Sequence, residues 1–210
     1  NGGHKSLHDY NKDKSVTARL GFDPTHFLHL SASAHHTGKL DAVNDGLSEI
    51  WFSNGFFRAL GTAATTHTFA ATLYELDAIA RWKSGHFQAT GGEAWFDDDS
   101  SASDDSRHLT FYSFELTQQL TRKLYGAARY GRIRADKGYP IIGLGNAGQY
   151  FYSPFAPRTT GLSRFSAGLG YQFDLSLIWK LEYSWESGHL VGGAPRGDTD
   201  ILATELGLKF

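Results

Sequence analysis

The sequence predicts an all-β protein, a transmembrane antiparallel up-and-down β-barrel. Three observations lead to this fold class. About nine segments alternate apolar and polar residues with the two-residue period of a strand, short and long connections alternate between them, and the charged strand residues gather on one face. A soluble barrel would have a dry interior and a charged exterior, so the reversed pattern indicates a dry outside and a charged lumen.

The last eleven residues, from Asp200 to Phe210, show the strand pattern most clearly. Their apolar face carries Leu202, Thr204, Leu206, Leu208 and Phe210. In an open sheet this amphipathic strand would be an unprotected edge, whereas closing a barrel removes the edge. The edge strand of a soluble β-sandwich is the alternative interpretation of this segment alone.

Composition limits the classes of protein that remain. The chain has 210 residues, 40% hydrophobic residues, 24 glycines and no cysteine. It has no run of about 18 apolar residues, which excludes a transmembrane helix. The absence of cysteine excludes disulfides and thiolate metal sites. A net charge of −2 gives no basic surface for nucleic acid. Because the chain lacks methionine, including an initiator, we expect a processed or incomplete product.

The other eight strands are expected along the chain at 15–23, 27–36, 69–82, 86–96, 107–117, 124–134, 160–173 and 177–186. Tight turns are expected where turn residues cluster, the first at Asp23, Pro24 and Thr25. Long connections are expected at 37–66, 97–105, 135–159 and 187–199. The faces of the segment 86–96 are unclear from its pattern, and Glu93 is assigned to the inside.

The assignment of residues to the two strand faces predicts two sets of functional residues. An aromatic belt beside the short turns and the terminus would mark the periplasmic interface, and it comprises Phe22, Trp82, Phe173, Trp179 and Phe210. The charged face would line the pore with Arg19, Glu75, Asp77, Arg81, Glu115, Arg129, Arg164, Lys180, Glu182 and Glu186. The arginines are candidates for a positive side of the lumen and the carboxylates for a negative side.

Strand parity bears on the extent of the barrel. A single-chain bacterial barrel has an even number of strands and both termini in the periplasm. The first of nine strands starts on the external side, so at least one upstream strand is expected to be missing. We therefore expect residues 1–210 to be the C-terminal portion of one outer-membrane barrel domain. A complete barrel of 16–18 strands would need roughly 370–420 residues.

The sequence resembles the C-terminal half of outer-membrane porins of the phosphate-selective O/P type. The resemblance lies in Y-E-L-D-A-I-A-R-W-K-S-G-H-F-Q-A-T-G-G-E, L-Y-G-A-A-R-Y-G-R, W-K-L-E-Y-S and T-E-L-G-L-K-F. It implies a 16-stranded trimeric pore in the bacterial outer membrane, narrowed by an inward-folded loop. Anion-selective members line the pore with cations, whereas this chain mixes signs, which argues against phosphate selectivity.

The expected function is passive diffusion of small hydrophilic or charged solutes through a water-filled lumen. A plugged lumen, or a scaffold barrel that holds a partner protein, remains the alternative. The connection 37–66 is a candidate constriction, although it could instead cap the barrel or pack on a neighbouring subunit.

Other motifs give weaker signals. The G-x-G-x-x-G match at 143–148 lacks a following helical pattern, so it predicts a loop rather than a nucleotide site. The histidines 29, 35 and 36 lie on one expected strand, where they are not placed to share a metal ion. No acidic residue lies near the serine–histidine pairs to orient a histidine for catalysis. We therefore expect no enzyme activity, no metal and no cofactor. The expected partners are outer-membrane lipid, the barrel assembly machinery acting on the C-terminal strand, and two further copies in a homotrimer.

Overall fold

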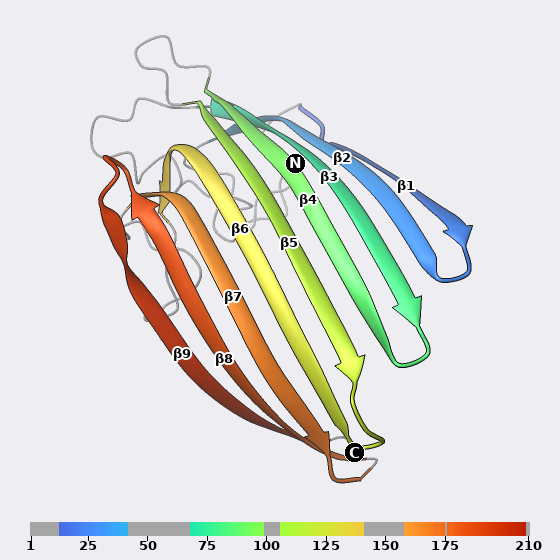
Figure 1. The fold of residues 1–210 in the computed structure, drawn as a ribbon. Helices are drawn as coiled ribbons and strands as arrows, with labels where there is room; N and C mark the ends of the chain where they lie inside the picture. The colour runs from blue at the N-terminus through green and yellow to red at the C-terminus, as the bar shows by residue number, and fades with distance from the viewer. Residues whose placement is uncertain (1–12, 42–67, 99–105, 141–157, 175, 209–210) are drawn as a thin grey trace.

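The computed structural model describes residues 13–41, 68–98, 106–140, 158–174 and 176–208. These residues form one curved antiparallel sheet in which each strand pairs with the next along the chain (Figure 1). The strands are β1 Val16–Thr25, β2 Leu28–Asp41, β3 Thr68–Trp82, β4 Gly85–Asp98, β5 Arg107–Gln119, β6 Leu124–Pro140, β7 Arg158–Gln172, β8 Leu177–Leu190 and β9 Pro195–Leu208. The nine expected strands are thus confirmed, with up-and-down order. Within the described residues no helix is long and apolar enough to cross a membrane.

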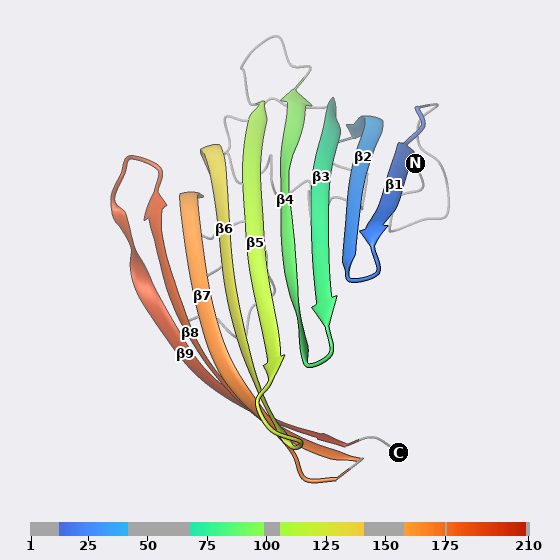
Figure 2. The same cartoon turned by 45° about the vertical axis from the view of Figure 1, so that its right-hand side comes forward.

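The sheet is a single curved layer, like a section of a barrel wall (Figure 2). Turns join β1 to β2, β3 to β4, β5 to β6 and β7 to β8 at one end, which we call the turn end. The opposite end, where β2, β4 and β6 finish, is the loop end. In the described sheet, β1 and β9 each have a neighbour on one side only, so the sheet is unclosed.

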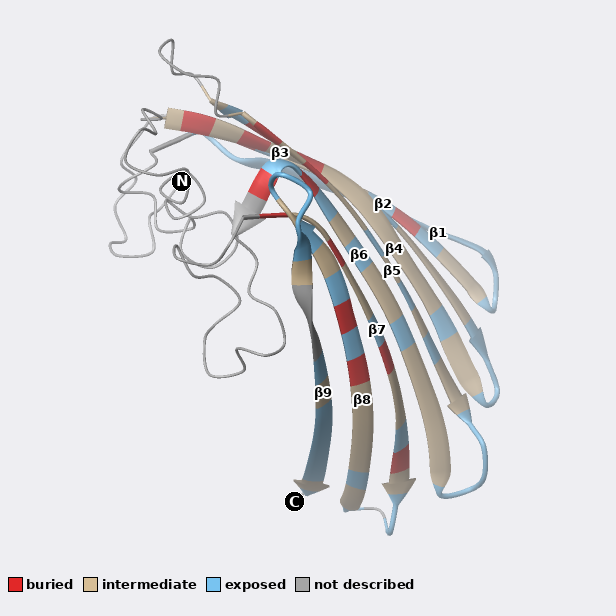
Figure 3. Ribbon diagram, turned by 60° about the vertical axis from the view of Figure 1, so that its left-hand side comes forward, coloured by how far each residue is buried: buried red, intermediate tan, exposed pale blue. Residues whose placement is uncertain are grey.

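The two faces of the sheet differ in packing. Apolar side chains on the outer face are widely exposed, as at Leu20 (80%), Leu76 (67%) and Leu202 (67%). On the inner face, residues such as Ser31, Ser166 and Ser184 are buried, although they belong to the same single layer. This difference is what curvature produces, because side chains crowd on a concave face and splay on a convex one. Buried residues are most frequent toward the loop end (Figure 3).

The β8–β9 connection corrects the expected long loop at 187–199. Both strands continue beyond the expected boundary, and only Val191 to Ala194 connect them. Gly192 (φ 95°) and Gly193 (φ 85°) adopt the left-handed backbone that favours glycine. The Leu190 N–H donates to the Ala194 carbonyl over 2.8 Å and closes the turn. The segment expected to be a long loop therefore forms a compact hairpin.

Three smaller expectations also change. The first turn lies at His26 and Phe27, because β1 continues through Pro24 with a register shift between Phe22 and Thr25. Proline is tolerated there because the strand pairing is irregular between Phe22 and Thr25. The strands β2 and β6 extend to Asp41 and Pro140, into ranges expected to be loops.

The inside assignment of Glu93 is wrong. Glu93 pairs with Tyr74 of β3, whose exposed ring marks the outer face, whereas Ala94 and Phe96 are buried on the inner face. The candidate constriction, the glycine motif at 143–148 and the acidic run from residue 99 lie outside the described residues.

Candidate functional site

The inner face carries the residues expected to line a pore. They come from six of the nine strands, with the same alternation that places Leu20, Leu76 and Leu116 on the outer face. All ten expected positions lie on the inner face: Arg19, Glu75, Asp77, Arg81, Glu115, Arg129, Arg164, Lys180, Glu182 and Glu186. They do not form separate positive and negative sides, since Arg19, Arg129 and Arg164 each contact a carboxylate on another strand.

Asp77 on β3 is the centre of the first polar group. Nη2 of Arg19 lies 3.2 Å from Oδ2 of Asp77, reaching across β2. The Ser31 hydroxyl donates to the same oxygen over 3.1 Å and accepts from Arg19 over 2.9 Å. The Thr90 hydroxyl donates to Oδ1 over 2.9 Å. Three strands besides β3 therefore satisfy one carboxylate, which fixes its position on the wall.

Glu115 on β5 is the centre of the second group. Nε of Arg129 on β6 lies 3.1 Å from Oε2 of Glu115, and Nε2 of His86 on β4 lies 3.8 Å from Oε1. All three side chains are more than a third exposed. This group therefore forms an open, solvent-facing ion pair rather than a buried one.

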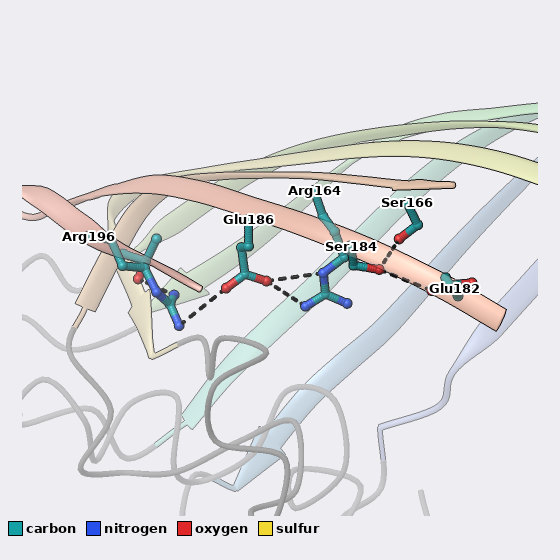
Figure 4. Close-up of polar contacts among 7 residues, drawn as sticks. Arg164, Ser166, Glu182, Ser184, Glu186 and Arg196 are labelled. Atoms are coloured by element: carbon teal, nitrogen blue, oxygen red, sulfur yellow. Dashed lines mark hydrogen bonds and ion pairs between the residues drawn. The ribbon is translucent and has the colours of Figure 1, made fainter. Parts of the chain in front are cut away.

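The third group lies toward the loop end, around the buried carboxylate of Glu186 (Figure 4). The Glu186 side chain is 1% exposed, and Nε and Nη2 of Arg164 donate to its Oε2 over 3.1 and 2.6 Å. Nη2 of Arg196 approaches Oε1 to 4.0 Å. Burial lowers the pKa of Arg196 from its ordinary value, and the charge of Glu186 opposes that effect. The sequence pattern identified Arg164 and Glu186 but missed Arg196, because it lay in the expected loop.

Hydroxyl groups extend this third group along β7 and β8. Ser166 and Ser184 face each other across the two strands and share a buried hydrogen bond. The Ser184 hydroxyl also donates to Oε1 of Glu182 over 3.1 Å (Figure 4). Two sets of polar contacts, one around Glu186 and one around Ser184, thus follow each other along the inner face.

Two further charged sites lie on the inner face. Near the turn end, Nζ of Lys180 donates to Oε1 of Glu205 over 3.0 Å. Arg81 is exposed and makes no ion pair with the described residues. Most of the charges that face the lumen side therefore neutralise one another locally.

An apolar cluster occupies the inner face at the loop end, and the sequence reasoning missed it. Its members are Phe69, Ala71, Ala94, Phe96, Leu109 and Ala135, with Leu73 and Ile133 packed against them. Phe69 and Phe96 are each 1% exposed. The sequence could have predicted this cluster. Its residues occupy the same alternate strand positions as the charged inner residues nearer the turn end, which assigns them to the inner face. The inner face is therefore polar along part of its height and apolar toward the loop end.

The expected aromatic belt lies on the outer face at the turn end. Phe22, Trp82, Phe173 and Trp179 are all exposed there, whereas Phe210 lies outside the described residues. The indole N–H of Trp82 donates to Gln118, and that of Trp179 donates to Thr204. An apolar ring with a satisfied polar edge suits a membrane–water interface.

A second aromatic row on the outer face lies toward the loop end. Its members are Tyr74, Trp95, Tyr112, Tyr130, Phe165, Tyr183 and Trp185, and ring contacts join them in groups. Tyr74 stands eight residues from Trp82 on β3, or about 27 Å of strand. When the strand is tilted, that length suits an apolar band about 25 Å tall between two girdles.

Within the described part of the chain, no group of three or more histidine or acidic side chains is placed to hold a metal ion. The faces, the girdles and the strand order together define the class of fold, an outer-membrane β-barrel wall. The expected fold class is confirmed by the comparison with solved structures.

OmpT of Vibrio cholerae, an outer-membrane protein, is similar to this chain in structure. Its outer-membrane-expressed form matches with a TM-score of 0.52 and 13% identity, over 92% of this chain and 53% of that chain. The in-vitro folded form gives 0.48 and 12%, with the same coverage. The chain thus spans about half the length of the solved structures it matches. No protein-family model and no curated protein matches the sequence. The fold agrees with the expected location in a bacterial outer membrane.

Proposed function

We propose that the protein is an outer-membrane porin that lets small hydrophilic solutes diffuse passively through a water-filled lumen. The observation that supports the proposal is the difference in polarity between the two faces of the sheet. Charged and hydroxyl side chains occupy the inner face through much of its height, while leucine and aromatic side chains cover the outer face. A wall with this polarity solvates ions on one side and lipid on the other.

The pairing of the wall charges favours a general pore over a phosphate-selective one. A phosphate filter needs cations that are free to bind the solute. Here Arg19, Arg129 and Arg164 each contact a carboxylate, and Arg81 is left without such a partner in the described residues. We propose weak charge selectivity, no catalytic activity, membrane insertion by the barrel assembly machinery acting on the C-terminal strand, and a homotrimeric state.

Planar-bilayer conductance tests the proposal directly. The protein, purified with its native termini and reconstituted, is expected to give ohmic current steps that scale with salt concentration. A heat-denatured sample of the same preparation should give none. The absence of steps from folded protein would contradict an open pore.

The apolar inner cluster favours a second candidate, a barrel whose lumen is filled or holds a partner protein. Phe69 and Phe96 would be costly to leave against water, and both are buried. In that case bilayer current is absent, and a stoichiometric protein copurifies after a salt wash. Conductance and copurification together therefore separate the two candidates.

A further inference from the structure

One row of four paired residues crosses the inner face near the turn end, from β6 to β9. Tyr125 pairs with Gly170, Gly170 with Lys180, and Lys180 with Glu205. Directly paired residues lie on the same side of a sheet, so all four share the inner face of Lys180. The row therefore brings an aromatic ring, an ammonium and a carboxylate together on the lumen side.

The side chain of Tyr125 reaches across the sheet to the neighbouring strand. Its hydroxyl and the adjoining ring edge lie over Gly170, where an added Cβ would overlap the ring. Glycine at this position thus lets the ring approach the backbone of β7. Tyr125 is half-buried, so the part of the ring that does not cover Gly170 is accessible from the lumen.

A hollow of about 330 Å³ adjoins this row at the turn end. Lys180 and Glu205 line it, together with Gln172, Ile178 and Gly207. Its volume falls within the range of about 300–1,000 Å³ that is usual for small-molecule sites. Nζ of Lys180 donates to Glu205 over 3.0 Å, and both side chains are more than a third exposed. An ammonium has three donors and a carboxylate two oxygens, so this pair has further capacity for a ligand.

We propose that this row and the adjoining hollow bind a neutral saccharide unit as it passes through the lumen. The sugar ring packs its C–H groups against Tyr125, because the negative face of an aromatic ring attracts them. Its hydroxyls hydrogen-bond to Lys180, Glu205 and the amide of Gln172. The inference rests on the proposed function, since a solute reaches this row through a water-filled lumen, and it adds the class of solute.

The ion pair favours a neutral polyhydroxyl solute over an ionic or apolar one. Lys180 and Glu205 neutralise each other, so a phosphate or an ammonium on the solute would have to compete with the existing partner. An apolar solute would cover these polar groups without hydrogen-bonding to them, which is costly. Hydroxyl groups both donate and accept, so a sugar can bond to the two side chains without separating them.

Current recordings from the reconstituted full-length protein in planar bilayers test the inference. Maltotriose is titrated and compared with a polyethylene glycol of similar size, which has no hydroxyls along its chain. Maltotriose is expected to reduce the current saturably, whereas the polyether should reduce it only in proportion to its concentration. Tyr125→Leu should raise the half-saturating maltotriose concentration about two- to tenfold, the factor that loss of an aromatic contact produces.

Two further variants keep the result decisive. Lys180→Gln should raise the half-saturating concentration about two- to fivefold, because it removes a charged donor, and it decides alone if Tyr125→Leu does not fold. Tyr171→Leu is the matched control, since Tyr171 packs against Phe173 on the outer face, and it should change nothing. The current of each variant without sugar shows that the variant is folded and open.

The outcomes separate the saccharide site from the pore itself. Current that maltotriose and the polyether reduce alike would overturn the saccharide site and leave the pore intact. Equal effects of Lys180→Gln and Tyr171→Leu on the half-saturating concentration would do the same. Absence of current from the unsubstituted protein would overturn the proposed function and the saccharide site together.

Discussion

Arg164 and Glu186 face each other across β7 and β8, and two nitrogens of the guanidinium donate to one carboxylate oxygen. The other oxygen is approached by Arg196 from β9. One buried anion therefore connects three consecutive strands at the loop end. Because this group lies on the inner face, it can affect both the stability of the fold and the electric field in the lumen.

Replacing Glu186 by glutamine should destabilise the fold. The substitution removes the only carboxylate that contacts both arginines in the described residues and leaves two nearby cations. We expect a loss of about 2 kcal/mol, less than the roughly 3–5 kcal/mol of a fully buried pair, because Arg164 is partly exposed and can be hydrated. Denaturant unfolding of the protein in lipid vesicles measures the change.

Glu205→Gln is the matched control for that change. Glu205 pairs with Lys180, but both side chains are exposed, so its loss should cost under about 1 kcal/mol. Similar losses in the free energy of unfolding from the two substitutions would show that the burial of Glu186 does not determine how much its ion pairs stabilise the fold.

Arginine at Leu169 should test which face meets lipid. Leu169 is 48% exposed on the outer face, four residues from both Phe165 and Phe173, and so lies near the middle of the apolar band. A charge there is expected to cost about 2–4 kcal/mol in lipid vesicles. The same substitution at Gln88, on the inner face, should stay within about 1 kcal/mol. If both variants are equally stable, the outer face is not lipid-facing.

Charge selectivity of the proposed pore should respond to the pair formed by Glu115 and Arg129. Arg129→Ala leaves the carboxylate with only His86 nearby, so preference for cations should rise. Glu115→Ala should shift preference toward anions. Each change is expected to stay below about fivefold, since a unit charge at 4 Å in water is worth about 1 kcal/mol. Reversal potentials in a salt gradient measure it, and shifts of the same sign would contradict the assignment.

Period-two alternation accounts for what the sequence predicted correctly. Leu20, Leu76 and Trp179 were placed on the outer face because each stands in a strand with clear apolar and polar sides. In the segment around Glu93 the alternation is blurred by Ala89, Gly91 and Gly92, which carry no face preference, and the residue was assigned to the wrong side. Small residues thus mark where this kind of prediction fails.

The alternation of apolar and polar residues could not predict which side chains contact each other across strands. Arg19 and Asp77 are 58 residues apart, and only the registers of β1, β2 and β3 bring them to 3.2 Å. The same holds for Arg196, whose role depends on β9 starting at Pro195 rather than at Asp200. The ten charged residues expected to line the pore were therefore placed on the correct face, while their neutralisation in local groups depended on long-range geometry.

The β8–β9 hairpin gives the last prediction, because a compact hairpin and a flexible loop differ in protease sensitivity. Arg196 contacts Glu186, its Nη1 donates to Thr159 over 2.8 Å, and its side chain is 13% exposed. Trypsin acting on folded protein in vesicles is therefore expected to cleave slowly after Arg196.

Valine at both Gly192 and Gly193 should increase that cleavage. Their positive φ angles are strained for a β-branched residue, at a cost of about 1–3 kcal/mol each. No neighbouring atom lies within contact distance of an added Cβ at either glycine, so backbone conformation, rather than a clash, would cause the effect. Alanine at Ser187, which keeps the turn glycines, is the control. Rapid cleavage of the unsubstituted protein after Arg196 would contradict the hairpin, since a residue held between strands cannot enter a protease active site without local unfolding.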